Sequence, residues 1–297
     1  MQQPSAPRAA LPPFLDVATV RNDLDRFVLV EMRWSLDGSE GRERYLAAHL
    51  PGAVHVDLDT VAAGPPTAVG GRHPLPDPAR FAADLGALGI ADHDRVVVAD
   101  QGPGAIAARL AWMLRAIGGD AAVLDGGVAA WDGPLDRGEV TRPPVTRRVR
   151  PWPADRLADT DAVAALTGDD TAVVLDARDR ARFLGEVEPT SSPPGHVPGA
   201  RNAPFADNLD QGRLAPPDRL RATYAAIGAL DADEVVAYCG SGVTACHDLL
   251  VLEALGVTGR LYPGSWSAWS ADPARPVATG PAALDGPAGS DGSGTAC

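Results

Sequence analysis

The feature that most constrains the fold is an internal repeat, in which the second half of the chain restates four short motifs of the first. Matched positions lie between 138 residues (Arg44 to Arg182) and 147 residues (His49 to His196) apart. Solenoids repeat every ~20–50 residues, so this spacing indicates two copies of one domain. The echoed motifs are Val30-Glu31-Met32-Arg33 with Leu175-Asp176-Ala177-Arg178, Arg44-Tyr45 with Arg182-Phe183, His49 to Ala53 with His196 to Ala200, and Gly126 to Trp131 with Pro263 to Trp269.

Each copy alternates stretches typical of strands with stretches typical of helices. This alternation predicts an α/β fold of two tandem domains, each a mainly parallel sheet with helices on both faces. Ligands of such folds bind beyond the carboxyl ends of the strands. The first copy has predicted strands at 27–31, 95–99 and 121–124 and helices at 78–88 and 105–117; the second has strands at 171–175, 234–238 and 259–262 and helices at 162–166, 217–227 and 243–255.

Composition divides the 297 residues into five segments. Residues 1–15 and 278–297 are rich in Pro, Ala, Gly and Ser without apolar periodicity, so we expect disordered tails there. Residues 136–158 contain several prolines and charges, which predicts an extended linker of limited flexibility. Residues 16–135 and 159–277 remain as the two domains, each large enough to bury its own core.

A cysteine stands at one of the predicted strand ends of the second copy. Cys239 follows an apolar strand, and Gly240 and Gly242 allow a tight loop before the next helix. Loop amides and the positive end of the helix dipole converge at such a position, which lowers the pKa of a thiol and favours the reactive thiolate. An ordinary buried cysteine is the alternative, but it leaves the Gly-Ser-Gly loop unexplained. The first copy has Asp100-Gln101 opposite Cys239 and therefore no nucleophile.

Charge and composition exclude several classes of function. The formal net charge is −13, whereas nucleic-acid and anionic-membrane surfaces need a clustered basic face, so we expect neither partner. All 26 basic residues are arginine, which excludes lysine Schiff bases and the lysine-containing phosphate loop and leaves anion recognition to arginine. Three cysteines without metal-ligand spacing predict no metal and a reducing compartment. Lacking a membrane-length apolar run or a secretory signal, the protein is expected in the cytoplasm.

The stretch from Cys239 to Thr244, Cys-Gly-Ser-Gly-Val-Thr, resembles the active-site loop of the two-domain rhodanese-type sulfurtransferases. Its Gly-Ser form is that of the 3-mercaptopyruvate sulfurtransferases, whereas the thiosulfate enzymes typically carry Arg and Lys at these two positions. Supporting matches extend over most of residues 17–275. The resemblance implies an inactive first rhodanese-like domain and a catalytic second one.

The resemblance also implies roles for individual residues. Arg182, an arginine followed by an aromatic residue, matches the arginine that holds the anionic group of the substrate, although any arginine in so charged a segment can be half of a surface salt bridge. Some 3-mercaptopyruvate enzymes carry a second arginine about nine residues later, but residues 188–192 contain none. In the loop, Cys239 is the implied nucleophile, and the implied substrate-binding residues are Gly240, Gly242, Val243 and Thr244.

A proton relay is implied by the same resemblance. Asp59 and His73 of the first copy match positions thought to form a Ser-His-Asp relay with the loop serine, which here is Ser241. A histidine oriented by a carboxylate can support proton transfer as pyruvate leaves. The alternative is that the His-Pro pair at residue 73 is only a solvent-exposed turn.

The expected reaction is transfer of a sulfane sulfur from 3-mercaptopyruvate through a Cys239 persulfide to cyanide or a thiol, such as thioredoxin or a low-molecular-weight thiol. No cofactor is required, and a monomer is expected. Thiosulfate is the rival donor; it carries two negative charges, and the Gly240-Ser241 loop contains no cation. A cysteine phosphatase would need an arginine six positions after the cysteine, where Ala245 stands. A non-enzymatic docking module is the third alternative, and the complete loop beside Arg182 argues against it.

Overall fold

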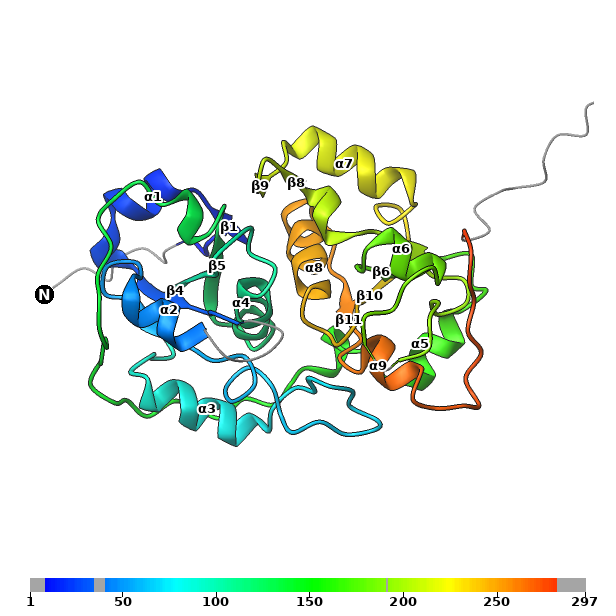
Figure 1. Ribbon diagram of the computed structural model, residues 1–297, viewed down its shortest axis with the longest axis horizontal. Helices are drawn as coiled ribbons and strands as arrows, with labels where there is room; N and C mark the ends of the chain where they lie inside the picture. The colour runs from blue at the N-terminus through cyan, green and yellow to red at the C-terminus, as the bar shows by residue number, and fades with distance from the viewer. Residues whose placement is uncertain (1–8, 35–40, 191, 282–297) are drawn as a thin grey trace, which may run out of the picture.

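The computed structural model describes residues 9–34, 41–190 and 192–281, which form two α/β lobes joined by a long connector (Figure 1). The sheet of the first lobe has the order β1-β5-β4-β2-β3, and every neighbouring pair is parallel. Its strands are β1 Phe14–Leu15, β2 Val28–Glu31, β3 Val54–His55, β4 Arg95–Ala99 and β5 Asp120–Leu124, and its helices are α1 Val17–Asn22, α2 Gly41–Ala47, α3 Pro78–Ala87 and α4 Ala107–Ala116.

The second lobe repeats this plan with the parallel order β11-β10-β6-β7 and a small antiparallel pair, β8-β9. Its strands are β6 Ala172–Asp176, β7 Arg201–Asn202, β8 Leu209–Asp210, β9 Arg213–Leu214, β10 Glu234–Tyr238 and β11 Arg260–Leu261. Its helices are α5 Thr160–Leu166, α6 Arg180–Leu184, α7 Pro217–Ala226, α8 Ala245–Ala254 and α9 Ser265–Trp269, and short 3-10 turns lie at Leu24–Arg26, Val128–Ala130, Ala154–Arg156 and Phe205–Asn208.

The predicted fold class is confirmed, because the structure contains two copies of a parallel sheet with flanking helices. The central strands β4 and β10 are almost wholly buried apolar runs, as expected where helices cover both faces of a sheet. The repeated histidines also have the same structural role in both lobes. His49 contacts the carbonyl of Tyr45 through Nδ1, and its ring stacks on the Tyr45 ring. His196 contacts the carbonyl of Phe183 through Nδ1, and its ring stacks on the Phe183 ring.

Parts of both predicted tails are instead ordered. Phe14–Leu15 pairs with β5, and Leu11 is buried in the same cluster, so the expectation of disorder up to residue 15 is wrong at its inner end. At the other terminus Ala278 bridges to His196, and the Gly280 amide donates to Leu184. Two-residue strands and single bridges carry no periodicity, which explains why composition misses them. Residues 1–8 and 282–297, including Cys297, lie outside the described residues.

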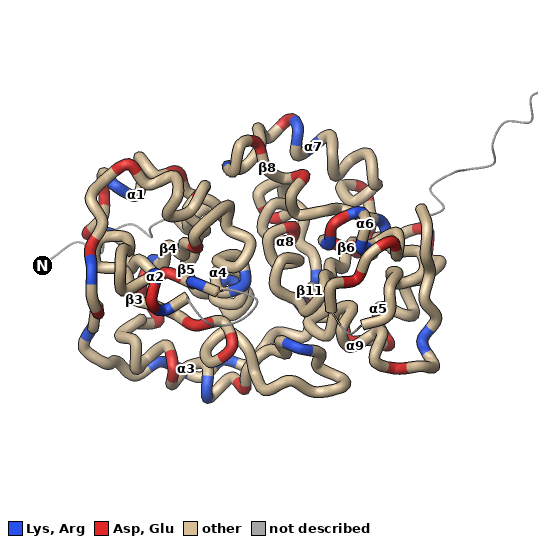
Figure 2. The backbone as a smooth tube through the Cα atoms, in the orientation of Figure 1, with Lys and Arg blue, Asp and Glu red and all other residues tan. Residues whose placement is uncertain are grey.

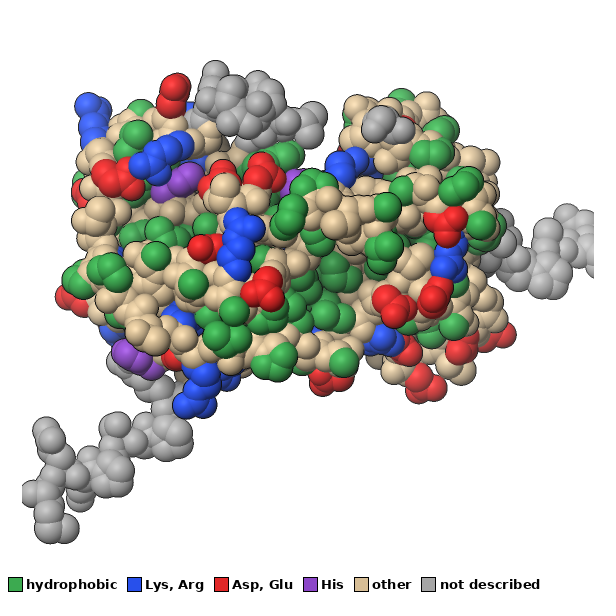
Figure 3. Space-filling model, turned by 90° about the horizontal axis from the view of Figure 1, so that it is seen from below, with side chains coloured by type: hydrophobic (Ala, Val, Ile, Leu, Met, Phe, Trp, Pro, Cys, Tyr) green, Lys and Arg blue, Asp and Glu red, His purple; other side chains and the backbone are tan. Residues whose placement is uncertain are grey.

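The two lobes pack against each other through helices α4 and α8, which lie side by side at the centre of the molecule (Figure 1). One continuous apolar cluster contains residues of both helices and both sheets. Arg115 on α4 donates from Nε to Glu253 Oε1 on α8 at 3.1 Å. From below, hydrophobic side chains lie along the junction of the lobes (Figure 3). The domains therefore share a core, which holds loops of one lobe against those of the other.

The connector crosses from one lobe to the other along the surface of the first. Val145 donates its amide to Gly86, Arg147 donates to Ile90, and Trp152 donates to Pro76. Extended backbone with regularly spaced anchors gives the connector a defined path. Among the described residues no helix has the length and apolar character needed to cross a membrane.

Candidate active site

Cys239 lies at the carboxyl end of β10, where the chain turns into α8. The residue is 2% exposed. Burial by itself would raise the pKa of its thiol, but the Thr244 side chain and the amides of Ser241, Val243 and Ala245 donate hydrogen bonds to the sulfur, and the net pKa is lowered. The loop therefore stabilises a thiolate by hydrogen bonds and backbone dipoles rather than by a charged side chain within it.

Helix α9 holds the outer side of this loop. The amide of Trp266 donates to the Cys239 carbonyl at 2.9 Å, and the amide of Ser267 donates to the Gly240 carbonyl at 3.0 Å. The Cys239 amide in turn donates to the Ser265 hydroxyl at 3.1 Å. Gly242 has φ +77°, a conformation that favours glycine. With its backbone groups satisfied from outside, the loop can direct its remaining amides at the sulfur.

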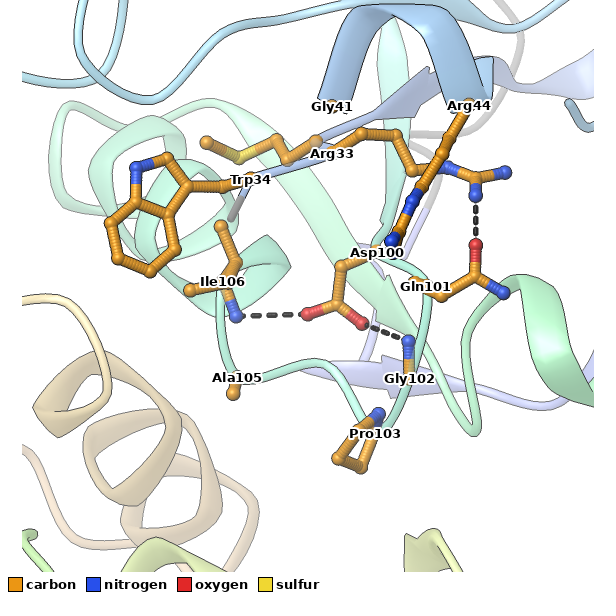
Figure 4. A pocket seen from close by; sticks show the side chains of 11 residues that line it. Arg33, Trp34, Gly41, Arg44, Asp100, Gln101, Gly102, Pro103, Ala105 and Ile106 are labelled. Atoms are coloured by element: carbon orange, nitrogen blue, oxygen red, sulfur yellow. Dashed lines mark hydrogen bonds between the residues drawn. The ribbon is translucent and has the colours of Figure 1, made fainter. Parts of the chain in front are cut away.

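The first domain builds the same cradle around a carboxylate. Asp100 accepts from the amides of Gly102, Gly104, Ile106 and Ala107 at 2.8 to 3.2 Å. Figure 4 shows two of these hydrogen bonds, those from Gly102 and Ile106. Three of these donors stand two, four and six positions after Asp100, the same offsets that Ser241, Val243 and Ala245 have from Cys239. Asp100 is therefore the counterpart of Cys239. Its neighbouring cavity of about 170 Å³, lined by Arg33, Trp34, Arg44 and Gln101, has no nucleophile.

Arg182, on α6, reaches the catalytic loop. A Cβ built on Gly240 would lie 3.3 Å from Arg182 Nη2 and 3.5 Å from its Nη1, so the guanidinium group borders the loop directly after the cysteine. Nη2 also donates to Glu188 at 2.9 Å, while Nε has no partner among the described residues. Arg178 is instead buried in an ion pair with Asp176, which places it as a structural residue at the strand end. Figure 2 shows arginine and acidic positions interleaved at β6 and α6.

Ser241, His73 and Asp59 meet across the domain junction. His73 Nδ1 lies 2.8 Å from the Ser241 hydroxyl, and its Nε2 lies 3.1 Å from Asp59 Oδ1. A carboxylate only accepts, so Nε2 carries the hydrogen and Nδ1 accepts from the serine. Burial lowers the pKa of His73, with Asp59 opposing this effect, so the ring is neutral near pH 7. The alternative of a solvent-exposed His-Pro turn does not describe this geometry.

Two arginines of the first domain, neither predicted from the sequence as a site residue, contact the loop of residues 239–244. Arg72 precedes His73, and its Nη2 lies 3.1 Å from the Cβ built on Gly240. Arg109 on α4 is fully buried and donates to the carbonyls of Gly242, His73 and Ala62 at 2.8 to 3.2 Å. In the sequence, the position of Arg109 among apolar residues of the predicted helix 105–117 could have indicated a buried arginine. Nothing local distinguishes Arg72 from other loop arginines.

The other described cysteine lacks the features of Cys239. Cys246 is buried on α8, its thiol donates to the Gly242 carbonyl at 3.4 Å, and burial raises its pKa to about 12. It is thus a core residue that stays protonated at neutral pH. Across the described part of the chain, no group of three His, Cys, Asp or Glu side chains could hold a metal ion.

The two lobes share one loop geometry, which surrounds a cysteine thiol of lowered pKa in one lobe and a carboxylate in the other; fold and site together define a protein of two related α/β domains with a single such cysteine among the described residues. The chain belongs to the rhodanese family: the family model described as "Rhodanese-like domain" matches residues 19–133 and 159–272. The prediction of a rhodanese-family sulfurtransferase made from the loop sequence is confirmed by this match and by the relatives below.

The names of the relatives mention two different sulfur donors, 3-mercaptopyruvate and thiosulfate. The chain is 45% identical over 263 residues to a probable 3-mercaptopyruvate sulfurtransferase of Pseudomonas aeruginosa, covering 85% of this chain and 92% of that one. It is 38% identical over 265 residues to a putative thiosulfate sulfurtransferase of Mycobacterium tuberculosis, covering 87% and 93%. A solved structure of the 3-mercaptopyruvate sulfurtransferase from Leishmania major superposes with a TM-score of 0.76 at 31% identity, covering 88% and 75%.

Proposed function

We propose that the protein transfers a sulfane sulfur from 3-mercaptopyruvate to a thiol acceptor, with Cys239 as the nucleophile. The observation that carries the proposal is the cradle around Cys239, whose hydrogen bonds outweigh burial and lower the pKa of the thiol. A carboxylate occupies the equivalent cradle of the first domain, which supports the view that this backbone geometry holds an anion. The same amides would stabilise the anion of a Cys239 persulfide.

In the first step the Cys239 thiolate attacks the sulfur of 3-mercaptopyruvate. A sulfur–sulfur bond forms, the carbon–sulfur bond breaks, and its electron pair leaves on carbon as the enolate of pyruvate. The enolate takes one proton to give pyruvate, and Cys239 remains as a persulfide. In the second step an acceptor thiolate attacks the outer sulfur of the persulfide. A new sulfur–sulfur bond forms on the acceptor, the bond to the Cys239 sulfur breaks, and the Cys239 thiolate is restored.

Ser241, His73 and Asp59 are proposed to handle the proton of the first step. The Ser241 hydroxyl sits two residues after the nucleophile and donates to neutral His73, whose other nitrogen is held by Asp59. This arrangement lets the Ser241 hydroxyl approach the sulfur donor while His73 accepts or returns a proton. Gly240, Gly242, Val243 and Thr244 are proposed to shape the substrate side of the loop, and Arg182 to hold the carboxylate.

The choice of 3-mercaptopyruvate over thiosulfate rests on charge. The loop segment Gly240-Ser241 offers dipoles but no cation, and Arg182 already shares its charge with Glu188. A dianion is therefore less well matched than a monoanion. We also propose that the acceptor is thioredoxin or a low-molecular-weight thiol, and that the enzyme is a cytoplasmic monomer. For a monomer, gel filtration should give the mass of one chain.

The test compares both donors on wild type, Cys239→Ala and the matched control Cys246→Ala, following pyruvate release and intact mass together. We expect wild type and Cys246→Ala to release pyruvate and gain one sulfur atom, and Cys239→Ala to do neither. A higher kcat/KM for thiosulfate would reverse the donor assignment. No pyruvate and no added sulfur with any donor would favour the docking-module alternative, and aryl phosphate hydrolysis lost in Cys239→Ala would favour a phosphatase.

A further inference from the structure

Three peptide groups of the cysteine loop, residues 239–245, direct an N–H at the Cys239 sulfur. Their amides belong to Ser241, Val243 and Ala245, and their carbonyls belong to Gly240, Gly242 and Thr244. A trans peptide group is planar, with its C=O and N–H on opposite sides. A donor that binds the carbonyl therefore also orients the N–H, and it polarises the N–H toward a stronger hydrogen bond.

The three carbonyls have donors of different charge. Neutral backbone amides bind two of them: Ser267 donates to Gly240 and His247 donates to Thr244, each at 3.0 Å. The Gly242 carbonyl instead accepts from Arg109 Nη1 at 2.8 Å. A guanidinium group of the first domain thus binds the far side of the peptide group whose Val243 N–H faces the sulfur. Hydrogen bonds with an ionised donor are about twice as strong as neutral ones.

Arg109 is a buried cation whose partners are uncharged. It is 0% exposed, and its three acceptors are backbone carbonyls, one of them that of His73. None of the ion pairs formed by the described residues includes it. Burial lowers the pKa of Arg109, and the thiols of Cys246 and Cys239 oppose this effect. A charge buried in this way is costly unless an opposite charge lies near it, and a Cys239 thiolate supplies one.

The second domain provides no such cation to the first. Arg109 stands nine positions after Asp100, and the residue nine positions after Cys239 is Asp248. Asp248 is buried and accepts from Asn208 Nδ2 at 2.8 Å. Helix α8 contains no arginine. The loop that already holds a carboxylate therefore receives no guanidinium group from α8, whereas the loop that holds a thiol receives one from α4.

We propose that Arg109 of the first domain is a positioning residue for the nucleophile, because its charged hydrogen bond to the Gly242 carbonyl orients and polarises the Val243 N–H that holds the Cys239 thiolate. Through Nη2 the same side chain donates to the His73 carbonyl at 3.0 Å, so one residue positions both the thiolate and the relay histidine. This inference rests on the proposed function for the role of Cys239. It gives the first domain, which lacks a nucleophile, a part in the reaction.

The first experiment measures the rate of iodoacetamide alkylation at Cys239 against pH, without any sulfur donor. Peptide mass resolves this cysteine from the other thiols. Wild type is compared with Arg109→Gln, Arg109→Lys and the matched control Arg147→Gln. Arg147 is also buried and donates to the carbonyls of Ile90 and Ala91, away from the cysteine loop. The other charged or titratable groups near Cys239 are the same in all variants: Arg72, Arg182, Glu188, His73, Cys246 and Asp248.

We expect Arg109→Gln to raise the midpoint of the pH–rate profile by about one pH unit, which means about tenfold less thiolate at a pH below the midpoint. Lysine keeps the charge but is too short to place a donor where Nη1 lies, so Arg109→Lys should leave about threefold less thiolate than wild type. Arg147→Gln should keep the wild-type midpoint.

A wild-type midpoint in a folded Arg109 variant would overturn the role of Arg109, and so would an equal shift in Arg147→Gln. If Arg109→Gln does not fold, Arg109→Lys alone decides between these results.

The second experiment measures kcat/KM for 3-mercaptopyruvate with the same variants. We expect Arg109→Gln to lower it about threefold at a pH below the midpoint, because the remaining thiolate is a stronger nucleophile and offsets part of the loss. A shifted midpoint with wild-type kcat/KM would overturn the part of Arg109 in the reaction. If wild type releases no pyruvate while the midpoint still depends on Arg109, the proposed donor is wrong and the control of Cys239 by Arg109 is retained.

Discussion

Gly242 and Gly256 form a natural pair for testing how the catalytic loop controls Cys239. Both have positive φ, +77° and +92° respectively. A Cβ on Gly256 would meet nothing within 4 Å, whereas one on Gly242 would lie 2.7 Å from the Pro263 carbonyl oxygen. Alanine at either position pays the left-handed backbone strain of about 1–2 kcal/mol. Only Gly242→Ala must also move the loop.

The size of that movement sets the expected effect. Carbon and carbonyl oxygen normally meet at roughly 3.3 Å, so the Gly242→Ala loop must shift by about half an ångström. The shift carries the amides of Ser241 and Val243 with it, and both donate to the Cys239 sulfur. Losing one hydrogen bond to a charged acceptor destabilises the thiolate by about 1.5 kcal/mol, which makes the thiolate about tenfold less populated at a pH below the thiol pKa. A less stabilised thiolate is also the stronger nucleophile, which offsets part of this loss, so alkylation should slow about threefold.

The assay is the rate of iodoacetamide alkylation at Cys239, followed by intact mass, alongside urea denaturation. We expect both variants to lose about 1–2 kcal/mol of unfolding free energy from strain, and only Gly242→Ala to react more slowly, by about threefold at a pH below the thiol pKa. Equal alkylation rates in Gly242→Ala and wild type would show that the loop amides do not determine the reactivity of Cys239. Slower alkylation in Gly256→Ala would show that strain, rather than loop position, is responsible.

Three further predictions concern buried polar groups. Burial lowers the pKa of His247 to about 4, so as pH falls below 6.5 the histidine is protonated in the unfolded chain before it is protonated in the folded one. The unfolding free energy should therefore fall by about 1.4 kcal/mol per pH unit between pH 6.5 and pH 4. In urea titrations at pH 7 and pH 5, His247→Gln should show a smaller loss than wild type. Arg109→Met leaves three buried carbonyls without a donor and should lower the unfolding free energy by about 3 kcal/mol; a melting temperature like that of wild type would contradict this. Asp100→Asn weakens the first-domain cradle and should lower the unfolding free energy by about 2 kcal/mol with kcat/KM unchanged; a comparable fall in kcat/KM would indicate that the first-domain cradle acts on catalysis.

The regular elements were predictable because their signals are local. The predicted strands at 95–99 and 234–238 coincide with β4 and β10, since uninterrupted apolar runs between turns identify buried parallel strands. The inner ends of the tails were not predictable. Phe14–Leu15 forms a strand only because β5 presents an open edge to it, and no property of these residues indicates that edge.

The position of the proposed nucleophile and the existence of two related domains follow from the sequence alone, because the repeat, the strand-loop-helix pattern and the family loop lie in short contiguous stretches. The charges that surround Cys239 were decided by tertiary structure. His73 and Ser241 are 168 residues apart, and Arg109 and Gly242 are 133 apart, yet each pair is in hydrogen-bond contact. Electrostatic and hydrogen-bonding partners act over a few ångströms, and the packing of the two lobes, through α4 on α8 and through the loop before α3 on α9, brings these residues within that range.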